Sequence, residues 1–465
     1  MVLAHNCGLC VTHTLHDVYS FIDSLQHRGR DATGIAAIAD NRIDVLKWAG
    51  PVKRFDNTDL HKIFSGNYHT FMAHVRYATR GNKDRILKYA HPITFRGQED
   101  DRGDHVLISD CEAAIVHNGQ VDDSFFKGYI EGSEMELDTE KLLRLYTLLG
   151  EKAILKEIPG AYTLAIADKK KKDVVVLRDR HGMKPGVLGW KDGKYVVASE
   201  GVAFIENGAN LIENLQPGTA YYLSPKGSYS IEKVVEGAPQ RACFFEGNYI
   251  SHVLSNLGGV AIRSIRERLG EQLAKEFHPE NADFVTFLPR CPEIAARSYA
   301  NSLGLSFMPV FYKVRGERAF QGPDDKERKN SIIRNLQLLP GIEKELEGKT
   351  IICVDDSIVR GNNSSWAREL LYERGKVKQA YLVSYTPKMG IIPEDGIARG
   401  CEFGVDMPST DNFIARGRTE EEIGKLLGMP TKYISLEGML KVFDELGIGS
   451  NNLCTYCIGG KYPLS

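Results

Sequence analysis

One run of residues is especially informative about the fold: Ile351-Ile352-Cys353-Val354-Asp355-Asp356-Ser357-Ile358-Val359-Arg360-Gly361-Asn362-Asn363-Ser364-Ser365. Its four leading apolar residues predict a short buried strand that ends in two acids. A turn of small and polar residues follows, and a helix is expected to begin near Ser364. In open α/β sheets, ligands lie at the carboxyl ends of the strands. Loop amides and a helix N-terminus can hold a phosphate there.

The side chains of this loop suit a sugar phosphate. Two adjacent carboxylates can bind the vicinal hydroxyls of a ribose, and they can stabilise the positive charge that develops when a leaving group departs from the anomeric carbon. Hydroxyl groups on Ser357, Ser364 and Ser365 add hydrogen-bond donors. An acidic turn that merely caps a helix is the alternative. The candidate binding residues are Asp355, Asp356, Ser357, Arg360, Gly361, Asn362, Asn363 and Ser364.

The elements around this loop predict a parallel sheet. Helices are expected at Val260–Phe277 and Ser364–Arg374, and strands at Phe284–Leu288, Thr350–Val354 and Ala380–Tyr385. This alternation of helix and strand is the βαβ pattern. Helical pieces and turns are expected over Thr419–Leu446.

The N-terminal half has a different pattern, rich in strands. Helices are predicted at His13–Leu25 and Thr139–Leu148, and these favour an α+β or layered α/β domain. The composition loosens over Ser224–Gln240, where a domain boundary is predicted. The expected strands are Thr33–Ala39, Thr70–Tyr77, Ala113–His117, Tyr162–Ala167, Val174–Leu177 and Tyr195–Ala198.

Bulk properties exclude several classes of protein. The 465 residues are 42% hydrophobic and 26% charged, with a net charge of -2, which gives no electrostatic reason to expect binding to nucleic acid or to an anionic membrane. No apolar run approaches the ~18 residues that a membrane span needs. The first residues lack the apolar segment of a secretory signal, so a cytoplasmic location is expected.

A candidate nucleophile lies near the start, in Asn6-Cys7-Gly8-Leu9. A cysteine at the true N-terminus can use its own α-amino group as general base. Because an amide nitrogen is no base, this interpretation requires removal of residues 1–6 as a propeptide. A cysteine packed in an apolar strand is the alternative. The chain has nine cysteines, an odd and scattered set that does not favour a disulfide framework.

The loop at 355–365 resembles the phosphoribosyl pyrophosphate (PRPP) signature of type I phosphoribosyltransferases. Its variant Asp-Asp-Ser-Ile-Val-Arg-Gly is similar to that of the amidophosphoribosyltransferase family. The resemblance implies an N-terminal nucleophile hydrolase domain with αββα layers over residues 7–235, which is a class II glutamine amidotransferase. A type I phosphoribosyltransferase domain with a parallel sheet and a cysteine-containing tail would follow over residues 236–465.

The resemblance assigns roles in the N-terminal half. It makes Cys7 the nucleophile, and it makes Arg76, in His74-Val75-Arg76-Tyr77, the partner of the glutamine α-carboxylate. Asn118 and Gly119 would stabilise the oxyanion, and Asp138 would receive the α-ammonium group. In the second half, Asp355 and Asp356 would hold PRPP together with Mg²⁺.

Four cysteines match the family's ligands for a [4Fe–4S] cluster. They are Cys243, Cys401, and the pair in Cys454-Thr455-Tyr456-Cys457. Four thiolates suit either that cluster or zinc, and only the family resemblance favours iron. The remaining cysteines, Cys10, Cys111, Cys291 and Cys353, are interpreted as packing residues.

The chain departs from the family in the transferase half. Pro289-Arg290-Cys291 replaces the small-residue pyrophosphate loop, and Val314-Arg315-Gly316 replaces an Asn-Arg-Tyr core. The first hypothesis is a homo-oligomeric enzyme with purine-nucleotide feedback that makes 5-phosphoribosylamine from PRPP and glutamine, the first step of purine synthesis. Two alternatives are a glutaminase paralogue that passes ammonia to another acceptor, and a non-catalytic PRPP or nucleotide sensor.

Overall fold

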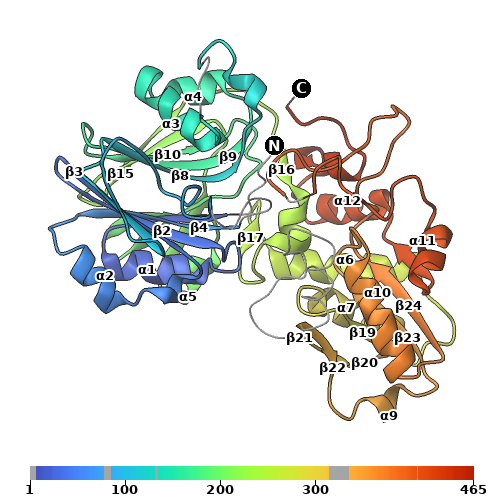
Figure 1. Cartoon of the computed structure of the whole chain (residues 1–465). Helices are drawn as coiled ribbons and strands as arrows, with labels where there is room; N and C mark the ends of the chain where they lie inside the picture. Colours follow the sequence, from blue (N-terminus) through green and yellow to red (C-terminus); the bar gives the residue numbers. More distant parts are fainter. Residues whose placement is uncertain (1–6, 78–84, 131–134, 314–334, 406, 465) are drawn as a thin grey trace.

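The computed structural model describes residues 7–77, 85–130, 135–313, 335–405 and 407–464. The N-terminal half and the C-terminal half lie side by side (Figure 1). Residues 1–6, which hold the predicted propeptide, lie outside the described part. So does Val314-Arg315-Gly316.

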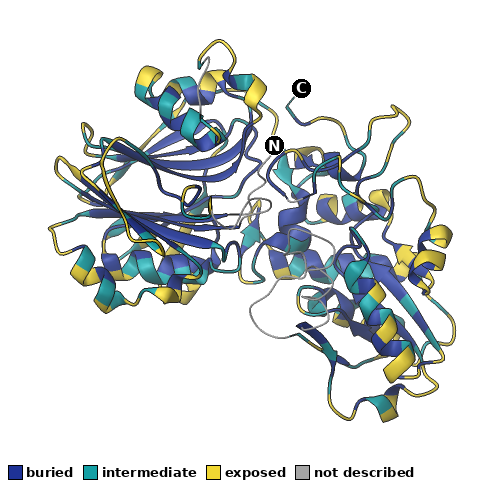
Figure 2. Cartoon of the chain, in the orientation of Figure 1, coloured by how far each residue is buried: buried dark blue, intermediate teal, exposed yellow. Residues whose placement is uncertain are grey.

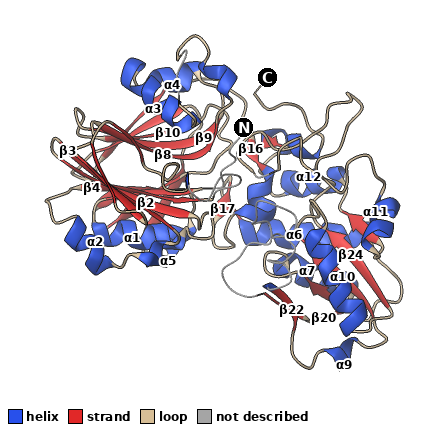
Figure 3. Ribbon diagram, in the orientation of Figure 1, coloured by secondary structure: helices blue, strands red, loops and turns tan. Residues whose placement is uncertain are grey.

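The N-terminal half contains two stacked antiparallel sheets (Figure 3). The first has the order β13-β11-β12-β1-β4-β2-β3-β7-β6 and the second has the order β15-β14-β10-β9-β8-β5. The strands of the first are β1 (Gly8–Thr12), β2 (Ala32–Ala39), β3 (Arg42–Ala49), β4 (Thr70–Arg76), β6 (Gln98–Asp101), β7 (His105–Ser109), β11 (Val187–Lys191), β12 (Lys194–Ala198) and β13 (Asn210–Asn214). Those of the second are β5 (Ile93–Phe95), β8 (Ala113–Gln120), β9 (Ala161–Asp168), β10 (Val174–Arg178), β14 (Thr219–Leu223) and β15 (Tyr229–Lys233).

Helices cover the outer face of each sheet. In Figure 1 the first sheet carries α1 (Leu15–Ser24), α2 (Asn57–Ile63) and α5 (Val202–Glu206), and the second carries α3 (Asp138–Leu149) and α4 (Glu151–Glu157). The strands alternate between two cores: Ala114 and Val116 of β8 face the other sheet, while Ala113 and Ile115 pack with the helical side. Figure 2 shows this burial on both sheets. The predicted αββα layering is therefore confirmed.

The C-terminal half is built on a parallel sheet with the order β20-β19-β23-β24-β25. Along β23, Ile351 and Cys353 face one core and Ile352 and Val354 face the other, which explains the unbroken apolar run. The strands are β19 (Phe284–Phe287), β20 (Ser306–Phe307), β23 (Thr350–Asp355), β24 (Gln379–Ser384) and β25 (Thr431–Tyr433). The helices are α6 (Ile262–Glu276), α7 (Glu293–Leu303), α9 (Glu343–Leu346), α10 (Asn362–Glu369), α11 (Glu420–Leu427) and α12 (Leu436–Glu445).

Three local expectations need correction. The helix after the acidic loop begins at Asn362, not near Ser364, because Gly361 adopts a left-handed conformation (φ +80) directly before it. The same helix is α-helical only to Glu369 and continues as a π-helix over Leu370–Arg374. The region Ser224–Gln240, where a domain boundary is predicted, contains strand β15 (Tyr229–Lys233). Its Gly, Ser and Lys residues are more typical of a linker than of a strand.

The end of the chain returns to the segment that joins the two halves. Strand β16 (Ala242–Cys243) pairs in parallel with β26 (Leu453–Cys454), so that Cys243 and Cys454 are partners in the register. A π-helix over Glu246–Ile250 follows β16 and packs on α6. Within the described residues, none of the helices has the length and apolarity that a bilayer crossing requires.

Candidate active sites and the cysteine cavity

Cys7 lies directly before β1, the strand between β12 and β4 of the first sheet, and it is fully buried. Burial raises the pKa of its thiol to about 11, although the charges of Arg76, Lys184 and Arg28 oppose this shift. With an amide on its nitrogen, Cys7 is therefore a protonated thiol at neutral pH. A free α-amine would supply the missing base.

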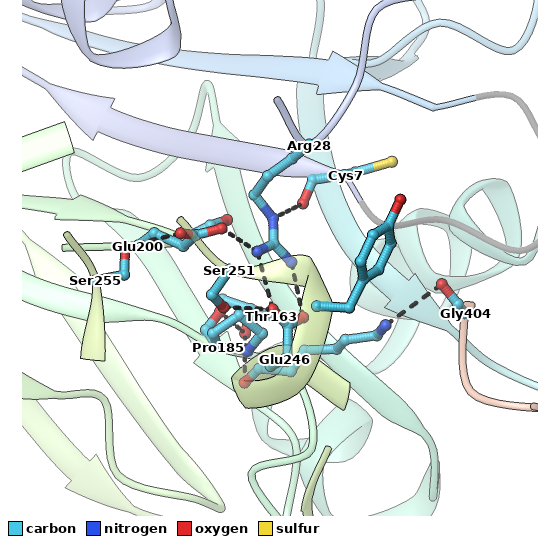
Figure 4. Close-up of polar contacts among 12 residues, drawn as sticks. Cys7, Arg28, Thr163, Pro185, Glu200, Glu246, Ser251, Ser255 and Gly404 are labelled. Atoms are coloured by element: carbon cyan, nitrogen blue, oxygen red, sulfur yellow. Dashed lines mark hydrogen bonds and ion pairs between the residues drawn. The ribbon is translucent and has the colours of Figure 1, made fainter. Parts of the chain in front are cut away.

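A buried ion network holds the backbone of the nucleophile (Figure 4). Arg28 Nε donates to the carbonyl of Cys7 at 2.9 Å, and its Nη1 and Nη2 donate to the carboxylate of Glu246 at 3.0 and 2.8 Å. Arg28 also pairs with Glu200, and Glu200 accepts from Ser255 Oγ at 2.7 Å. Since Glu246 belongs to the segment between the two halves, this network ties Cys7 to the start of the C-terminal half.

The predicted glutamine clamp combines one cation and one carboxyl group. Arg76 ends β4 and is buried, and no described residue accepts a hydrogen bond from its Nε. The carboxylate of Asp138, at the start of α3, accepts from the N–H groups of Val121 at 2.9 Å and Thr139 at 2.8 Å. Burial raises the pKa of Asp138 to about 6. Burial lowers the pKa of Arg76, and Cys7 and Asp138 oppose this shift when they are ionised, so the three groups lie close together.

The predicted oxyanion pair lies on β8. Asn118 is completely buried, yet neither Oδ1 nor Nδ2 has a hydrogen-bond partner among the described residues. Buried amides are usually hydrogen-bonded, so both polar atoms of this side chain are available to a ligand. At Gly119 the backbone has φ +150, and an added Cβ would approach the carbonyl oxygen of Ala161 to 1.9 Å, so only glycine fits.

A set of buried histidines packs beside these residues. The sequence alone predicts no role for them. Thr139 Oγ1 contacts His117 Nδ1 at 2.9 Å and His91 Nε2 at 3.1 Å, and His74 Nε2 contacts the carbonyl of His117 at 2.9 Å. Burial lowers the pKa of both His74 and His117 to about 3, so these rings are neutral. Their positions in the sequence could have indicated this role. His74, His117 and Thr139 lie within two positions of Arg76, Asn118 and Asp138, respectively.

The predicted sugar-phosphate loop lies at the carboxyl end of β23. Asp355, Asp356 and Ser357 are buried, and Asp356 Oδ1 accepts from Ser357 Oγ at 2.8 Å. Burial raises the pKa of Asp356 to about 6, and burial together with the charge of Asp356 raises that of Asp355. Two buried carboxyl groups at such close range favour a bound cation or hydroxyl donors.

The other predicted loop residues have mixed surroundings. Ser364 is buried in the first turn of α10, and Asn362 and Asn363 begin that helix rather than the loop. Arg360 forms an ion pair with Asp411, so part of its charge is already engaged within the chain. Arg290, in the altered pyrophosphate loop, is exposed and donates to the carbonyl of Lys313 at 3.4 Å.

The four predicted cluster ligands line one cavity. It is bounded by Lys184, Met183, Phe245, Gly400, Phe403, Val405, Met407 and Tyr456, together with Cys243, Cys401, Cys454 and Cys457. Among the residues that the structure describes, no group of three or more His, Cys, Asp or Glu side chains is arranged to hold one metal ion. The four thiols nevertheless border the same space. Cys10, Cys111 and Cys353 are each buried in a hydrophobic core.

Comparison with known proteins agrees with this arrangement. A family model described as a glutamine amidotransferase domain matches residues 103–236. An amidophosphoribosyltransferase of Methanocaldococcus jannaschii is 30% identical, over 96% of this chain and 94% of the relative. One of Bacillus subtilis is 31% identical, over 96% and 90% of the two chains.

Solved structures extend the similarity to the whole fold. Glutamine PRPP amidotransferase from Bacillus subtilis, complexed with ADP and GMP, superposes with a TM-score of 0.80 at 28% identity, covering 98% of this chain and 97% of that chain. A structure described as the allosteric regulatory enzyme of purine biosynthesis gives a TM-score of 0.81 at 28% identity. The predicted pairing of a nucleophile hydrolase fold with a phosphoribosyltransferase fold is thereby confirmed. The chain belongs to the amidophosphoribosyltransferase family.

Proposed function

We propose that this chain makes 5-phosphoribosylamine from PRPP and the amide nitrogen of glutamine. The observation that carries the proposal is the unsatisfied Asn118 amide beside Arg76 and Asp138, in a chain that also carries the acidic loop after β23. The first set suits the charged ends and the amide of glutamine, and the second suits a phosphorylated ribose. Relatives of the same name match this chain over nearly its full length.

In the N-terminal half, the Cys7 sulfur attacks the amide carbon of glutamine. Arg76 pairs with the α-carboxylate, and Asp138 pairs with the α-ammonium group. The Asn118 side chain and the Gly119 N–H stabilise the oxyanion of the tetrahedral intermediate. Collapse breaks the carbon–nitrogen bond, ammonia leaves with the proton held by the α-amine, and water hydrolyses the remaining thioester to glutamate.

In the C-terminal half, the ammonia nitrogen attacks C1 of PRPP and displaces pyrophosphate. Asp355 and Asp356 face the ribose hydroxyls and the charge that develops at C1, while Ser357, Ser364 and the first turn of α10 surround the 5-phosphate. Mg²⁺ would neutralise the diphosphate, and the paired carboxyl groups of Asp355 and Asp356 are the side chains suited to interact with it.

Removal of residues 1–6 is part of the proposal. Support comes from the pKa of the Cys7 thiol, which burial raises to about 11, so that the unprocessed residue has neither a thiolate nor a base. Intact-mass analysis tests it: active protein should begin at Cys7. Full glutaminase activity in protein that retains Met1 would contradict this step.

A [4Fe–4S] cluster on Cys243, Cys401, Cys454 and Cys457 is also proposed. The four cysteines line one cavity, which supports a shared centre. Four thiolates suit either such a cluster or zinc, and the family resemblance favours iron. Its role would be structural, joining β16 to β26. Iron and sulfide analysis of anaerobically purified protein, with an absorption spectrum, tests this assignment.

A homo-oligomer, purine-nucleotide feedback and a cytoplasmic location stay predictions. The bound ADP and GMP named for the Bacillus subtilis structure support nucleotide binding at most by similarity. Analytical ultracentrifugation with and without AMP, GMP and ADP would test the assembly and its response.

One experiment tests the main proposal against the alternatives. Processed protein is assayed anaerobically for glutamate and 5-phosphoribosylamine, with and without PRPP. PRPP-stimulated glutaminase activity with phosphoribosylamine formation supports the proposal. Glutaminase activity without PRPP stimulation and without phosphoribosylamine formation would favour an enzyme that passes ammonia to another acceptor. The exposed Arg290 in the altered loop would then contact that acceptor. No glutaminase activity and a retained N-terminus would favour a sensor.

A further inference from the structure

Lys184 is an unusual residue in this structure, because its long cationic side chain is almost entirely buried. It is 1% exposed and lies in the turn between β10 and β11. Its Nζ donates to the carbonyl of Gly404 at 3.4 Å, the contact that ends at Gly404 in Figure 4. No carboxylate of the described residues forms an ion pair with it.

The buried acids around this turn are engaged elsewhere. The Asp179 carboxylate accepts backbone N–H groups of His181 at 2.9 Å, Met183 at 3.0 Å and Tyr162 at 3.2 Å. Glu246 holds Arg28 and accepts from Ser251 Oγ at 2.7 Å. A single long hydrogen bond to one carbonyl does not offset the free-energy cost of taking an ammonium group out of water. Among the described residues, therefore, no carboxylate supplies the anion that this cation needs.

The cavity lined by the four cysteines is where an anion could lie close to Lys184. Lys184 lines the same cavity as Cys243, Cys401, Cys454 and Cys457, and the rest of the wall is mostly apolar. Cysteine ligates metals as the thiolate. Four thiolates outweigh the two positive charges of Zn²⁺ or of an oxidised [4Fe–4S] core, so a loaded centre carries net negative charge in a water-poor site.

We propose that Lys184 is the counter-charge of the metal centre held by the four cysteines, an inference that rests on the centre proposed above. Lys184 is not a ligand. Its ammonium group stabilises the anionic loaded state through the apolar cavity, and in the metal-free state the same group is an uncompensated buried charge. Loading and the stability of this region are thereby coupled through one residue.

The test compares Lys184→Met, which removes the charge, with Lys184→Arg, which keeps it. Full-length wild type and both variants are purified anaerobically and analysed for iron, sulfide and zinc per chain. Release of the metal to a chelator is then timed, and the reduction potential is measured if iron is present. Lys184→Met should release metal about 10- to 100-fold faster than wild type. Its potential should be more negative, because no cation stabilises the added electron. Lys184→Arg should stay close to wild type.

A second measurement separates this role from simple packing. After complete removal of metal, the unfolding temperature of Lys184→Met should exceed that of metal-free wild type, because the uncompensated charge is gone. A packing role predicts that Lys184→Met is less stable in both states. This comparison also decides the matter if the variant loads too little metal for kinetics.

The outcomes are distinguishable. Wild type that contains no iron, sulfide or zinc after anaerobic purification overturns the proposed centre and this inference with it. A loaded wild type together with a Lys184→Met variant that holds its metal equally long, at the same potential, overturns the role of Lys184 alone.

Discussion

The two candidate sites differ in how the fold positions them. The glutaminase residues lie at strand and helix ends within stacked sheets: Arg76 ends β4, Asn118 lies on β8 and Asp138 begins α3. The transferase residues lie on a loop after β23 and in the first turn of α10. The first site is therefore built on regular elements, whereas the second is built on the loop after β23 and the first turn of α10.

The two halves also differ in which unfavourable interactions they contain before a ligand binds. The glutaminase half tolerates an unsatisfied buried Asn118 amide and an arginine with an unpaired Nε, because neighbouring strands hold both residues in place. Such preorganised donors need no rearrangement during reaction. The transferase half instead keeps two carboxyl groups close together, and ligand binding would relieve their repulsion.

The largest expected effect comes from removing the central group of either site. Cys7→Ser should abolish the use of glutamine and spare the reaction of PRPP with free ammonia. Asp356→Asn should suppress phosphoribosylamine formation from both nitrogen donors while leaving basal glutaminase activity. The assay measures glutamate and pyrophosphate release in parallel. Loss of both activities in Cys7→Ser would show that the halves are not separate sites.

Removing the oxyanion amide should have the next largest effect. Asn118→Ala should lower glutamine-dependent kcat by about 100- to 1000-fold, because the side-chain donor to the oxyanion is lost. The KM for PRPP in the ammonia-dependent reaction should not change. A glutamine-dependent kcat within a few-fold of wild type would remove Asn118 from the oxyanion site.

The Arg28 network should link stability to glutaminase activity. Glu246→Gln leaves buried Arg28 with only the Glu200 carboxylate, so the free energy of unfolding should fall by about 3 kcal/mol. Glutamine-dependent activity should fall more than ammonia-dependent activity, because Arg28 holds the carbonyl of Cys7. Denaturant unfolding and the two assays measure this.

A matched control is available beside Glu246. Ser251→Ala removes the hydroxyl that donates to the same carboxylate but keeps both charges, so the free energy of unfolding should fall by only about 1.5 kcal/mol. Equal losses in the two variants would mean that the charge of Glu246 does not anchor Arg28.

The smallest expected effect is a pH dependence of glutamine binding. Because burial raises the pKa of Asp138 to about 6, its carboxyl group becomes protonated below that pH and no longer pairs with an α-ammonium group. The KM for glutamine should therefore rise about tenfold per pH unit below pH 6. Asp138→Asn should raise KM at pH 7 and remove this dependence.

The control uses ammonia as the nitrogen donor over the same pH range, at a constant concentration of free NH3, since burial also raises the pKa of Asp356 to about 6. Dividing the glutamine-dependent rate by the ammonia-dependent rate at each pH leaves the pH dependence that comes from glutamine binding by Arg76 and Asp138. A glutamine KM that stays constant down to pH 5 would contradict the role given to Asp138.

The sequence predicted much of the fold because its patterns are local. The unbroken apolar run before Asp355 follows from a strand that is buried on both faces, and the alternation along β8 follows from its two cores. The helix α10 begins two residues before the predicted Ser364, because the loop ends at Gly361. Strand β15 was missed because its surroundings resemble a linker.

The Cys-Gly pair near the start of the chain nominated Cys7, and the resemblance of local motifs to a known family nominated Arg76, Asn118 and the four clustered cysteines. What only the tertiary structure decided is which charges lack partners. Arg28 and Glu246 are 218 residues apart in sequence and form one ion pair, whereas Lys184 is buried without a carboxylate among the described residues. The physical reason is that electrostatic compensation depends on distance and burial, and neither can be read from the spacing of residues along the chain.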